Sequence, residues 1–252
     1  MLIDRIEAFA VGNPWKNWIL VKVSTDQGHV GWGEATTGLT TMPAFSAIGE
    51  IARLFVGRDP RAIQQNWPDA HKALYLTTDG AMMAAMAGIE TACWDIAGKE
   101  LGLPLYRLLG GERFKSLRPF AELLGLGGID MILPEFLGVG GLWRLKQVAA
   151  IAEAHNAMVS PHNAQSPLST ALNVHFDVAT PNAFIQECFD DFHVAWSSDL
   201  FEGAPVITDG FLAPSEAPGH GVTVNEAETG KHPYSERNFM NLFSAGWEKR
   251  NS

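Results

Sequence analysis

A carboxylate and an imidazole near the middle of the chain have the residue types of a proton-transfer pair. Glu135 follows the apolar run at residues 131–133, and His162 follows a second short run at residues 157–159. A carboxylate that orients and charges an imidazole is a common general acid/base arrangement. The two residues could equally be a solvated acid and a capping histidine on unrelated loops, and their spacing alone leaves both interpretations open.

The segment between these residues predicts how they are positioned. Glycines form a turn at residues 138–141, and apolar side chains then recur at helical spacing as far as residue 155. The order strand, helix, strand favours two parallel strands, whose C-terminal ends lie on the same side. We therefore expect Glu135 and His162 to lie close together, although they are 27 positions apart (162 minus 135).

This stretch resembles the sixth and seventh barrel strands of the enolase superfamily, in its mandelate racemase/muconate lactonizing enzyme branch. The shared pattern is an acid after a proline, a Gly-Gly turn, a helix with Ala-Glu-Ala-His and a strand ending in Pro-His-Asn. Within that branch it is most similar to the acid-sugar (galactonate-type) dehydratases. The resemblance implies that His162 is the catalytic acid or base and that Glu135 orients it. Glu135 stands where the family has Asp, which is one methylene shorter.

A second acid follows the next predicted strand, at residues 183–186. Glu187 matches the terminal Glu of the family's eighth strand, and the resemblance implies that it hydrogen-bonds the substrate carboxylate or the enolate. A carboxyl group does this only when it is protonated or paired with a donor. An ordinary ion pair at the end of a strand is the alternative interpretation of Glu187.

The first part of the chain predicts a small antiparallel sheet followed by helices. The strands are expected at residues 3–11, 18–24 and 30–34. A short Asp/Gly turn between the second and third strands is typical of a hairpin. The helices are expected at residues 43–55, from Pro60 onward with Asp59 as N-cap, and at 80–101.

Four short motifs in this part resemble the α+β capping domain of the same family. They are GWGE at residues 31–34, GRDP at 57–60, WDIAGK at 94–99 and PLYRLLGG at 104–111. The resemblance implies a capping domain over residues 1–113, completed by a return segment at residues 200–252.

The resemblance further implies that two loops of this domain, residues 12–17 and 36–44, close over the barrel mouth and select the substrate. The first loop holds Trp15 and Lys16, a stacking surface and a cation that could meet a sugar or a carboxylate. For Trp15, packing on its own turn is the alternative interpretation.

Residues 114–199 resemble a TIM-type (β/α) barrel that lacks its middle. Strands are expected at residues 117–121, 130–133, 157–160 and 183–186, and helices at 142–155 and 166–178. In family order these are strands 1 and 6–8. The predicted fold class is therefore an α+β capping domain plus an α/β partial barrel. Four strands cannot close a barrel that needs eight, and open edges bind other chains, so we expect either a homo-oligomer that covers these edges or poor solubility.

The reaction that the resemblance implies needs groups that this sequence lacks. Family members remove a proton from the carbon next to a carboxylate, and Mg²⁺ supports the enediolate that forms. The carboxylates that bind the metal, and a second base, come from strands two to five, for which the chain has no matching residues. We therefore predict no metal ligands and no tight Mg²⁺ binding. Two hypotheses remain: a sugar-acid dehydratase impaired in this chain, and a non-catalytic remnant that folds or assembles without turnover.

The composition limits which partners and which cellular compartment we expect for this protein. The formal net charge of −10 argues against nucleic acid and anionic membrane surfaces as partners. It does not exclude a small sugar acid, which needs only a local cation. Cys93 and Cys188 have no metal-ligand spacing and suit a reducing compartment. The sequence shows no basic leader and no long apolar run, so we expect a cytoplasmic protein.

Overall fold

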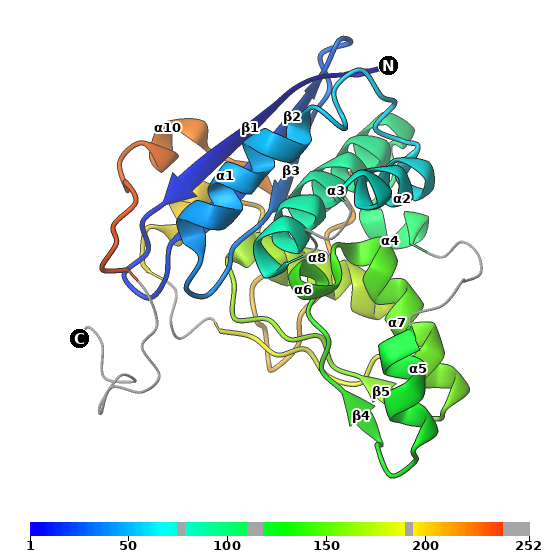
Figure 1. The fold of residues 1–252 in the computed structure, drawn as a ribbon. Helices are drawn as coiled ribbons and strands as arrows, with labels where there is room; N and C mark the ends of the chain where they lie inside the picture. The colour runs from blue at the N-terminus through cyan, green and yellow to red at the C-terminus, as the bar shows by residue number, and fades with distance from the viewer. Residues whose placement is uncertain (75–78, 110–117, 190–193, 239–252) are drawn as a thin grey trace.

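The computed structural model describes residues 1–74, 79–109, 118–189 and 194–238 (Figure 1). The chain opens with a three-stranded antiparallel sheet in the order β1 (Ile3–Val11), β2 (Trp18–Thr25) and β3 (Val30–Glu34). The register of β1 and β2 runs from Ile3 opposite Thr25 to Val11 opposite Trp18. The predicted three-stranded sheet is confirmed, with each strand boundary within one residue of the prediction.

Three helices follow the sheet: α1 (Thr41–Ala52), α2 (Ile63–Ala73) and α3 (Gly80–Leu101). The limits of α3 match the prediction, because Asp79 accepts the Met82 amide at its start and Gly102 is left-handed at its end. The prediction of a helix from Pro60 is wrong, because α2 begins at Ile63. Instead of capping α2, Asp59 closes a turn with the backbone and side chain of Arg61, two positions on.

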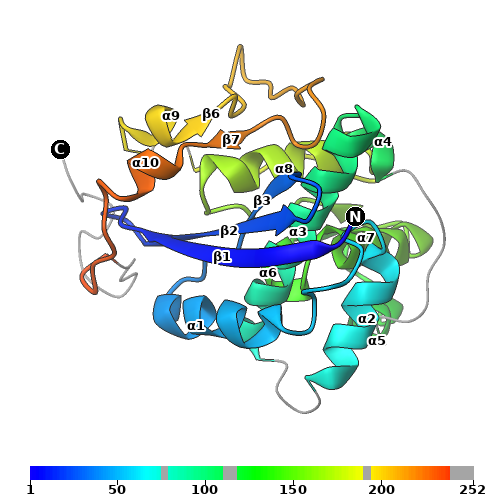
Figure 2. The same ribbon diagram turned by 90° about the horizontal axis from the view of Figure 1, so that it is seen from above.

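Alternate side chains of β2 enter two separate buried cores. Ile19 and Val21 pack with side chains of α1 and α3 on one face of the sheet. Trp18 and Leu20 pack on the other face with residues from the second half of the chain. Figure 2 shows α1 on one side of the sheet and α8 (Pro167–Val178) on the other. The sheet is therefore the layer through which the two halves of the molecule are joined.

Two glycines of β3 allow α3 to lie directly on the strand. A Cβ at Gly31 would come within 2.1 Å of the Ala92 carbonyl oxygen, and a Cβ at Gly33 within 2.1 Å of the Gly88 carbonyl oxygen. Only glycine tolerates so close a backbone approach. Trp32 lies between the two glycines and packs into the opposite core. This close packing explains the GWGE motif as a structural feature of the sheet.

The second half of the chain holds a short parallel pair of strands among helices. β4 (Met131–Ile132) pairs in parallel with β5 (Met158–Val159), and Val159 makes an isolated parallel bridge to Ala183. The helices are α4 (Leu105–Leu108), α5 (Arg118–Gly125), α6 (Phe136–Val139), α7 (Leu142–Ala154) and α8. The predicted parallel pairing and both predicted helices are confirmed. The expected strand at 183–186 is reduced to the bridge at Ala183.

The predicted strand at residues 117–121 is wrong for the residues that the structure describes there. Residues 118–121 form the first turn of α5, which packs on α7 and buries Leu124. A strand must find its hydrogen-bond partners on a neighbouring strand, whereas a helix satisfies its backbone internally. Because the strand that would follow it in a barrel has no counterpart here, the helix is the conformation that leaves fewer backbone groups unpaired.

The chain finally returns to the N-terminal sheet. The return contains α9 (Ser197–Leu200), β6 (Phe201–Glu202), β7 (Thr223–Val224) and α10 (Glu226–Thr229), and β6 and β7 pair antiparallel. His220 anchors it, donating its backbone N–H to Asp95 at 3.3 Å. Burial opposes ionisation of Asp95, but the charges and hydrogen bonds of His220 and Lys99 outweigh it and lower the pKa of Asp95.

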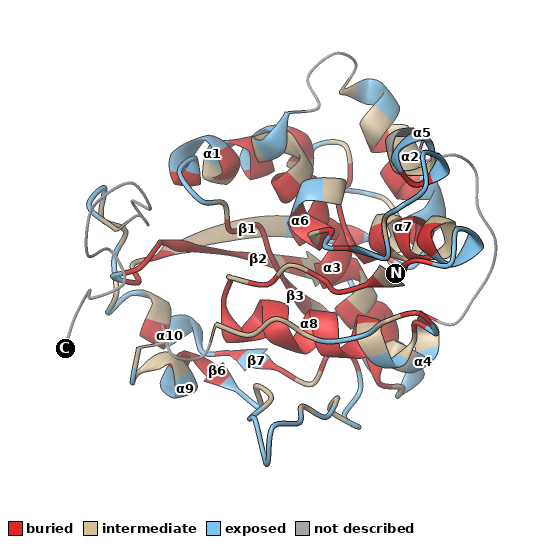
Figure 3. Cartoon of the chain, turned by 90° about the horizontal axis from the view of Figure 1, so that it is seen from below, coloured by how far each residue is buried: buried red, intermediate tan, exposed pale blue. Residues whose placement is uncertain are grey.

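Burial follows this layered arrangement. Figure 3 shows α8 almost wholly buried between the sheet and the return segment, whereas α5 lies at the surface. Among the described residues, no helix is both long and apolar enough to cross a membrane. The predicted domain limit near residue 113, and the tail residues Phe243 and Trp247, lie outside the described residues.

Candidate functional site

Three neighbouring segments bring the predicted residues together. The His162 backbone N–H donates to the Pro134 carbonyl at 3.0 Å, which carries the pairing of β4 and β5 beyond the strands. The Asn163 side chain donates to the Glu187 carbonyl at 3.2 Å, on the other side. Glu135, His162 and Glu187 are therefore adjacent, each one at the end of its own segment, as parallel topology requires.

The His162 ring lies between the two acids. Its Nδ1 is 3.4 Å from Oε1 of Glu135, and its Nε2 is 3.9 Å from Oε2 of Glu187. The side chains are 42%, 28% and 39% exposed for His162, Glu135 and Glu187, so solvent reaches all three. The hydrogen bond with Glu135 raises the pKa of His162, and partial burial opposes it. The expected closeness is confirmed, whereas the chemical roles stay predictions.

Two amides in the same loop hold the acids, and the sequence did not single them out. The Gln165 side chain donates to Oε1 of Glu135, the oxygen that faces the histidine. The Asn163 backbone N–H donates to Oε2 of Glu187 at 2.9 Å. Both amides lie within three positions of His162, and that nearness was the only available clue. The longer side chain of Glu135 is accommodated because Gln165 fixes its end.

Lys16 approaches the same site from the N-terminal part. Its side chain lies in the loop between β1 and β2 and is 7% exposed. Burial lowers the pKa of Lys16, while the charges of Glu135, Glu34 and Glu187 oppose this shift. The charge of Lys16 in turn lowers the pKa of His162. Trp15, the preceding residue, is buried as well, and its backbone N–H donates to the side-chain oxygen of Asn13 at 3.0 Å.

The return segment holds the loop that carries Lys16. The Gly12 N–H donates to the His232 carbonyl at 2.7 Å, and the Asn17 side chain donates to the Ser235 carbonyl at 2.9 Å. A Cβ at Gly12 would come within 2.1 Å of the Pro233 carbonyl oxygen. The loop is thus fixed at both ends by residues more than 200 positions away, which no local pattern predicts.

A buried carboxylate of the sheet forms hydrogen bonds with the start of α8, the helix that follows the loop of His162. Glu34, at the end of β3, is fully buried and accepts hydrogen bonds from Ser166, Ser169 and Thr36. Ser166 is the N-cap of α8, so the carboxylate stabilises the positive end of that helix. The second predicted loop, 36–44, is therefore anchored at Thr36, and residues 41–44 belong to the first turn of α1. Its part in substrate choice stays a prediction.

Glu90 of α3 binds the start of α7 in the same way that Glu34 binds the start of α8. It accepts from the backbone N–H of Leu142 at 3.0 Å and of Trp143 at 2.9 Å, and from the Trp94 indole at 2.7 Å. Burial raises the pKa of Glu90 to about 7, and the three hydrogen bonds offset only part of that effect. The sequence provides no reason to select Glu90, because the two backbone N–H groups that it binds at the start of α7 lie more than 50 positions away.

The residues that the structure describes do not form a binding site for a divalent metal. Within the described ranges, no group of three or more His, Cys, Asp or Glu side chains is placed to hold a metal ion. Mg²⁺ requires several oxygen ligands. Glu135 and Glu187 already accept from Gln165 and Asn163 and flank an imidazole. We therefore derive no chemical step through a metal in this chain.

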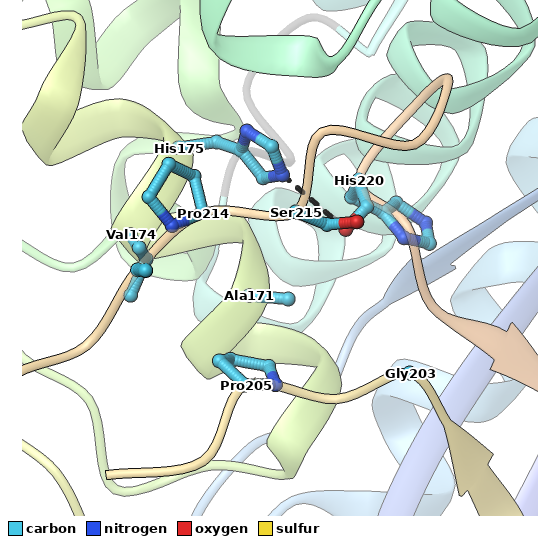
Figure 4. A pocket seen from close by; sticks show the side chains of 9 residues that line it. Ala171, Val174, His175, Gly203, Pro205, Pro214, Ser215 and His220 are labelled. Atoms are coloured by element: carbon cyan, nitrogen blue, oxygen red, sulfur yellow. Dashed lines mark hydrogen bonds between the residues drawn. The ribbon is translucent and has the colours of Figure 1, made fainter. Parts of the chain in front are cut away.

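A separate cavity of about 180 Å³ lies under the return segment, away from this site (Figure 4). His175 of α8 and His220 line it. His175 Nδ1 accepts the Tyr106 N–H at 3.1 Å, and Nε2 lies 3.3 Å from the His220 carbonyl. Burial lowers the pKa of His175 to about 4, so the ring is neutral near pH 7. Because both ring nitrogens are used, this cavity is not an acid/base site.

Two family models match the chain. The model described as "Enolase C-terminal domain-like" matches residues 69–228. The model described as "Mandelate racemase / muconate lactonizing enzyme, N-terminal domain" matches residues 10–110. These matches cover the residues from which the resemblance was inferred.

A curated relative aligns with this chain over a length that requires a long gap in this chain. The D-galactonate dehydratase of Verminephrobacter eiseniae is 22% identical over 341 aligned positions, which cover 83% of this chain and 89% of the relative. The aligned length exceeds the 252 residues of this chain, so a long part of the relative faces a gap here. This agrees with the predicted loss of the middle of the barrel.

Solved structures show the same fold. The mandelate racemase/muconate lactonizing enzyme from Sulfitobacter sp. has a TM-score of 0.83 at 22% identity, covering 93% of this chain and 96% of that one. An enolase from Pantoea ananatis, solved with D-gluconate and Mg, has a TM-score of 0.83 at 18% identity, covering 93% and 95%. The predicted fold class, a capping domain plus a partial barrel, is confirmed.

Proposed function

This chain belongs to the mandelate racemase/muconate lactonizing enzyme family of the enolase superfamily, and on that premise we propose that it keeps the acid/base half of a sugar-acid dehydratase site. The observation that carries this proposal is the position of His162 between Glu135 and Glu187 at the ends of neighbouring segments. Its relatives include D-galactonate dehydratases, which supports a sugar acid as the substrate class.

In the proposed site each residue has one task. His162 takes the proton from the carbon next to the substrate carboxylate, or returns a proton to the departing hydroxyl group. Glu135 orients the ring and stabilises its charged form, consistent with the raised pKa of His162. Glu187 hydrogen-bonds the substrate carboxylate. Trp15 and Lys16 contact the sugar acid from the capping side.

We propose further that turnover is impaired in this chain. In the family, Mg²⁺ stabilises the enediolate, and the described residues do not fit such an ion. Loss of a Lewis-acid metal removes several kcal/mol of transition-state stabilisation, which is roughly a thousandfold or more in rate. The same observation favours the second candidate, a remnant that folds or assembles without turnover.

The test is calorimetry with MgCl₂ followed by an assay over a panel of sugar acids that includes D-galactonate and D-gluconate. We expect no micromolar Mg²⁺ affinity and no dehydration above that of a His162→Asn control. Micromolar affinity, or dehydration that His162→Asn abolishes, would show that the site is complete and that impairment is wrong.

We also propose that the chain forms a homo-oligomer and works in the cytoplasm. Apolar side chains next to the short strands are exposed, with Leu133 57%, Phe184 67% and Ile185 61% accessible. Exposed apolar groups beside an open sheet edge favour association. Cys93 and Cys188 are not joined in a disulfide, which suits a reducing compartment. A monomer in light scattering at high protein concentration would contradict the oligomer.

A further inference from the structure

Lys16 differs from the other partly buried lysines in having no partner for its amine. Lys22, Lys99 and Lys146 each donate to a carboxylate or a carbonyl oxygen. Within the described residues, Lys16 makes no hydrogen bond and no ion pair within 4.0 Å, although its side chain is only 7% exposed. A buried amine that is not bonded is available to react.

The surroundings of Lys16 favour the neutral amine more than solvent does. Burial penalises the ammonium form and lowers the pKa of Lys16, even though three carboxylates act in the opposite direction. For each unit by which the pKa falls, the neutral fraction near pH 7 rises about tenfold. A neutral, desolvated lysine amine is the nucleophile that adds to carbonyl groups.

Groups that can move protons lie within electrostatic range of this amine. The charges of Lys16 and His162 act on each other, and Glu135 is the carboxylate with the largest effect on Lys16. The side chains of His162 and Glu135 are partly exposed, whereas that of Lys16 is more deeply buried. The loop that carries Lys16 is held by Asn17 and Gly12, which fixes the position of the amine.

We propose that Lys16 forms a reversible imine with small 2-oxo acids, without a metal. The neutral Lys16 nitrogen bonds to the carbonyl carbon as the C=O double bond opens, and a proton passes from that nitrogen to the oxygen to give a carbinolamine. The C–O bond then breaks as His162 protonates the departing hydroxyl group. One water leaves and a protonated imine remains, and addition of water reverses the sequence. The positive His162 ring favours the carboxylate of a 2-oxo acid over a simple ketone.

This activity goes beyond dehydration and does not depend on it. It needs neither Mg²⁺ nor a sugar acid, so its test can succeed or fail independently of the proposed function. The test uses the full-length chain with pyruvate, sodium cyanoborohydride and EDTA, followed by peptide mass spectrometry. Cyanoborohydride reduces the imine to a stable secondary amine, which marks the lysine that formed it.

We expect the reduced pyruvate adduct to collect on Lys16, at least about tenfold above the exposed Lys72, because burial lowers the pKa of Lys16. Lys146 is the matched control, because burial also lowers its pKa but its amine donates to Ala179 and Thr180. Adducts spread evenly over Lys16, Lys72 and Lys146, or an unmodified Lys16, would overturn the proposal. Mapping of the wild-type chain is decisive even where a variant fails to fold.

Two variants separate the nucleophile from the proton donor. Lys16→Arg keeps the positive charge but cannot form an imine, so the adduct should disappear, whereas Lys146→Arg should leave it unchanged. His162→Asn should slow adduct formation by about a hundredfold, the lower end of typical general acid/base effects. An unchanged adduct yield in Lys16→Arg would overturn the proposal, and an unchanged rate in His162→Asn would overturn the role of His162.

Discussion

The N-terminal sheet and the partial barrel differ in what holds them together. The strands β1, β2 and β3 bond to each other along their length and bury both faces of β2. In the barrel part, β4 and β5 contribute two residues each, and α7 and α8 begin at carboxylates that belong to the N-terminal part. The first region is thus stabilised by its own ladder, whereas the second is stabilised by attachment to the first.

This difference explains how a barrel fragment keeps an ordered site without a barrel sheet. Glu34 fixes the start of α8, just after the loop of His162, and Glu90 fixes the start of α7, just after the loop of Glu135. The two residues of the acid/base pair are therefore positioned through helix termini rather than through a closed ring of strands. Breaking either attachment should affect the barrel part before the sheet.

The largest expected effect is that of Glu34→Ala. The change leaves the buried amides and hydroxyls of Ser166 and Ser169 without their acceptor, at about 1–3 kcal/mol for each orphaned group. With four such groups orphaned, we expect a loss of at least roughly 4 kcal/mol in the free energy of unfolding. Hydrogen exchange should show α8 losing protection while β2 keeps its own. Glu34→Gln, which retains one acceptor oxygen, is the control and should lose less. Equal loss of protection in both regions would refute the comparison.

The second-largest expected effect is the pH dependence of the free energy of unfolding that Glu90 causes. Because the folded-state pKa of Glu90 is raised to about 7, its contribution to stability is complete below its unfolded value, near 4.5. That contribution is lost as pH rises from about 4.5 to 7, on the order of 3 kcal/mol. Urea unfolding from pH 4 to 8 should show this fall.

Glu90→Gln is the matched control for that titration, because an amide does not ionise. The difference between the two stability curves isolates Glu90, since Asp177, whose pKa burial also raises to about 7, titrates in both proteins. Parallel curves for the two proteins would mean that Glu90 is not the group responsible.

The exposed edge of the barrel part should govern association with little effect on stability. Replacing Phe184 and Ile185 by Ser and Lys removes apolar surface that is 67% and 61% exposed. Exposed substitutions change stability by about 0.5 kcal/mol or less, so the unfolding midpoint should hardly move. Sedimentation should show a smaller oligomer or a monomer. An unchanged oligomer would place the interface elsewhere, and Phe211, 78% exposed in the return segment, is the control position.

The smallest expected effect is the coupling of His162 to Glu135. NMR titration should give His162 a pKa above the usual 6.5, because Glu135 favours its charged form. Its contribution to stability is therefore present below pH 6.5 and lost as pH rises through the folded-state pKa. Glu135→Gln should bring the pKa back down. A His162 pKa at or below 6.5 in the wild-type chain would contradict the ring–carboxylate contact.

Much of the fold followed from local patterns in the sequence. Alternating residues and a short turn predicted β2 and β3, and a long run rich in Ala and Met, apolar over most of its surface, predicted α3. The strand–helix–strand order also predicted that Glu135 and His162 would meet, because the geometry of a parallel crossover is nearly fixed. These features depend on neighbours along the chain or on a single right-handed connection.

Long-range contacts decided the rest. Residues 118–121 form a helix, although a strand was predicted. The prediction failed because the stability of a strand depends on neighbouring strands, and a local pattern does not show whether they are present. Lys16, Glu34 and Glu90 acquire their roles only when segments 50 or more positions apart come together and exclude water. The sequence by itself determined most of the elements and the closeness of Glu135 and His162. The tertiary structure alone decided which carboxylates hold those elements and how deeply Lys16 is buried, because burial and charge depend on neighbours in space.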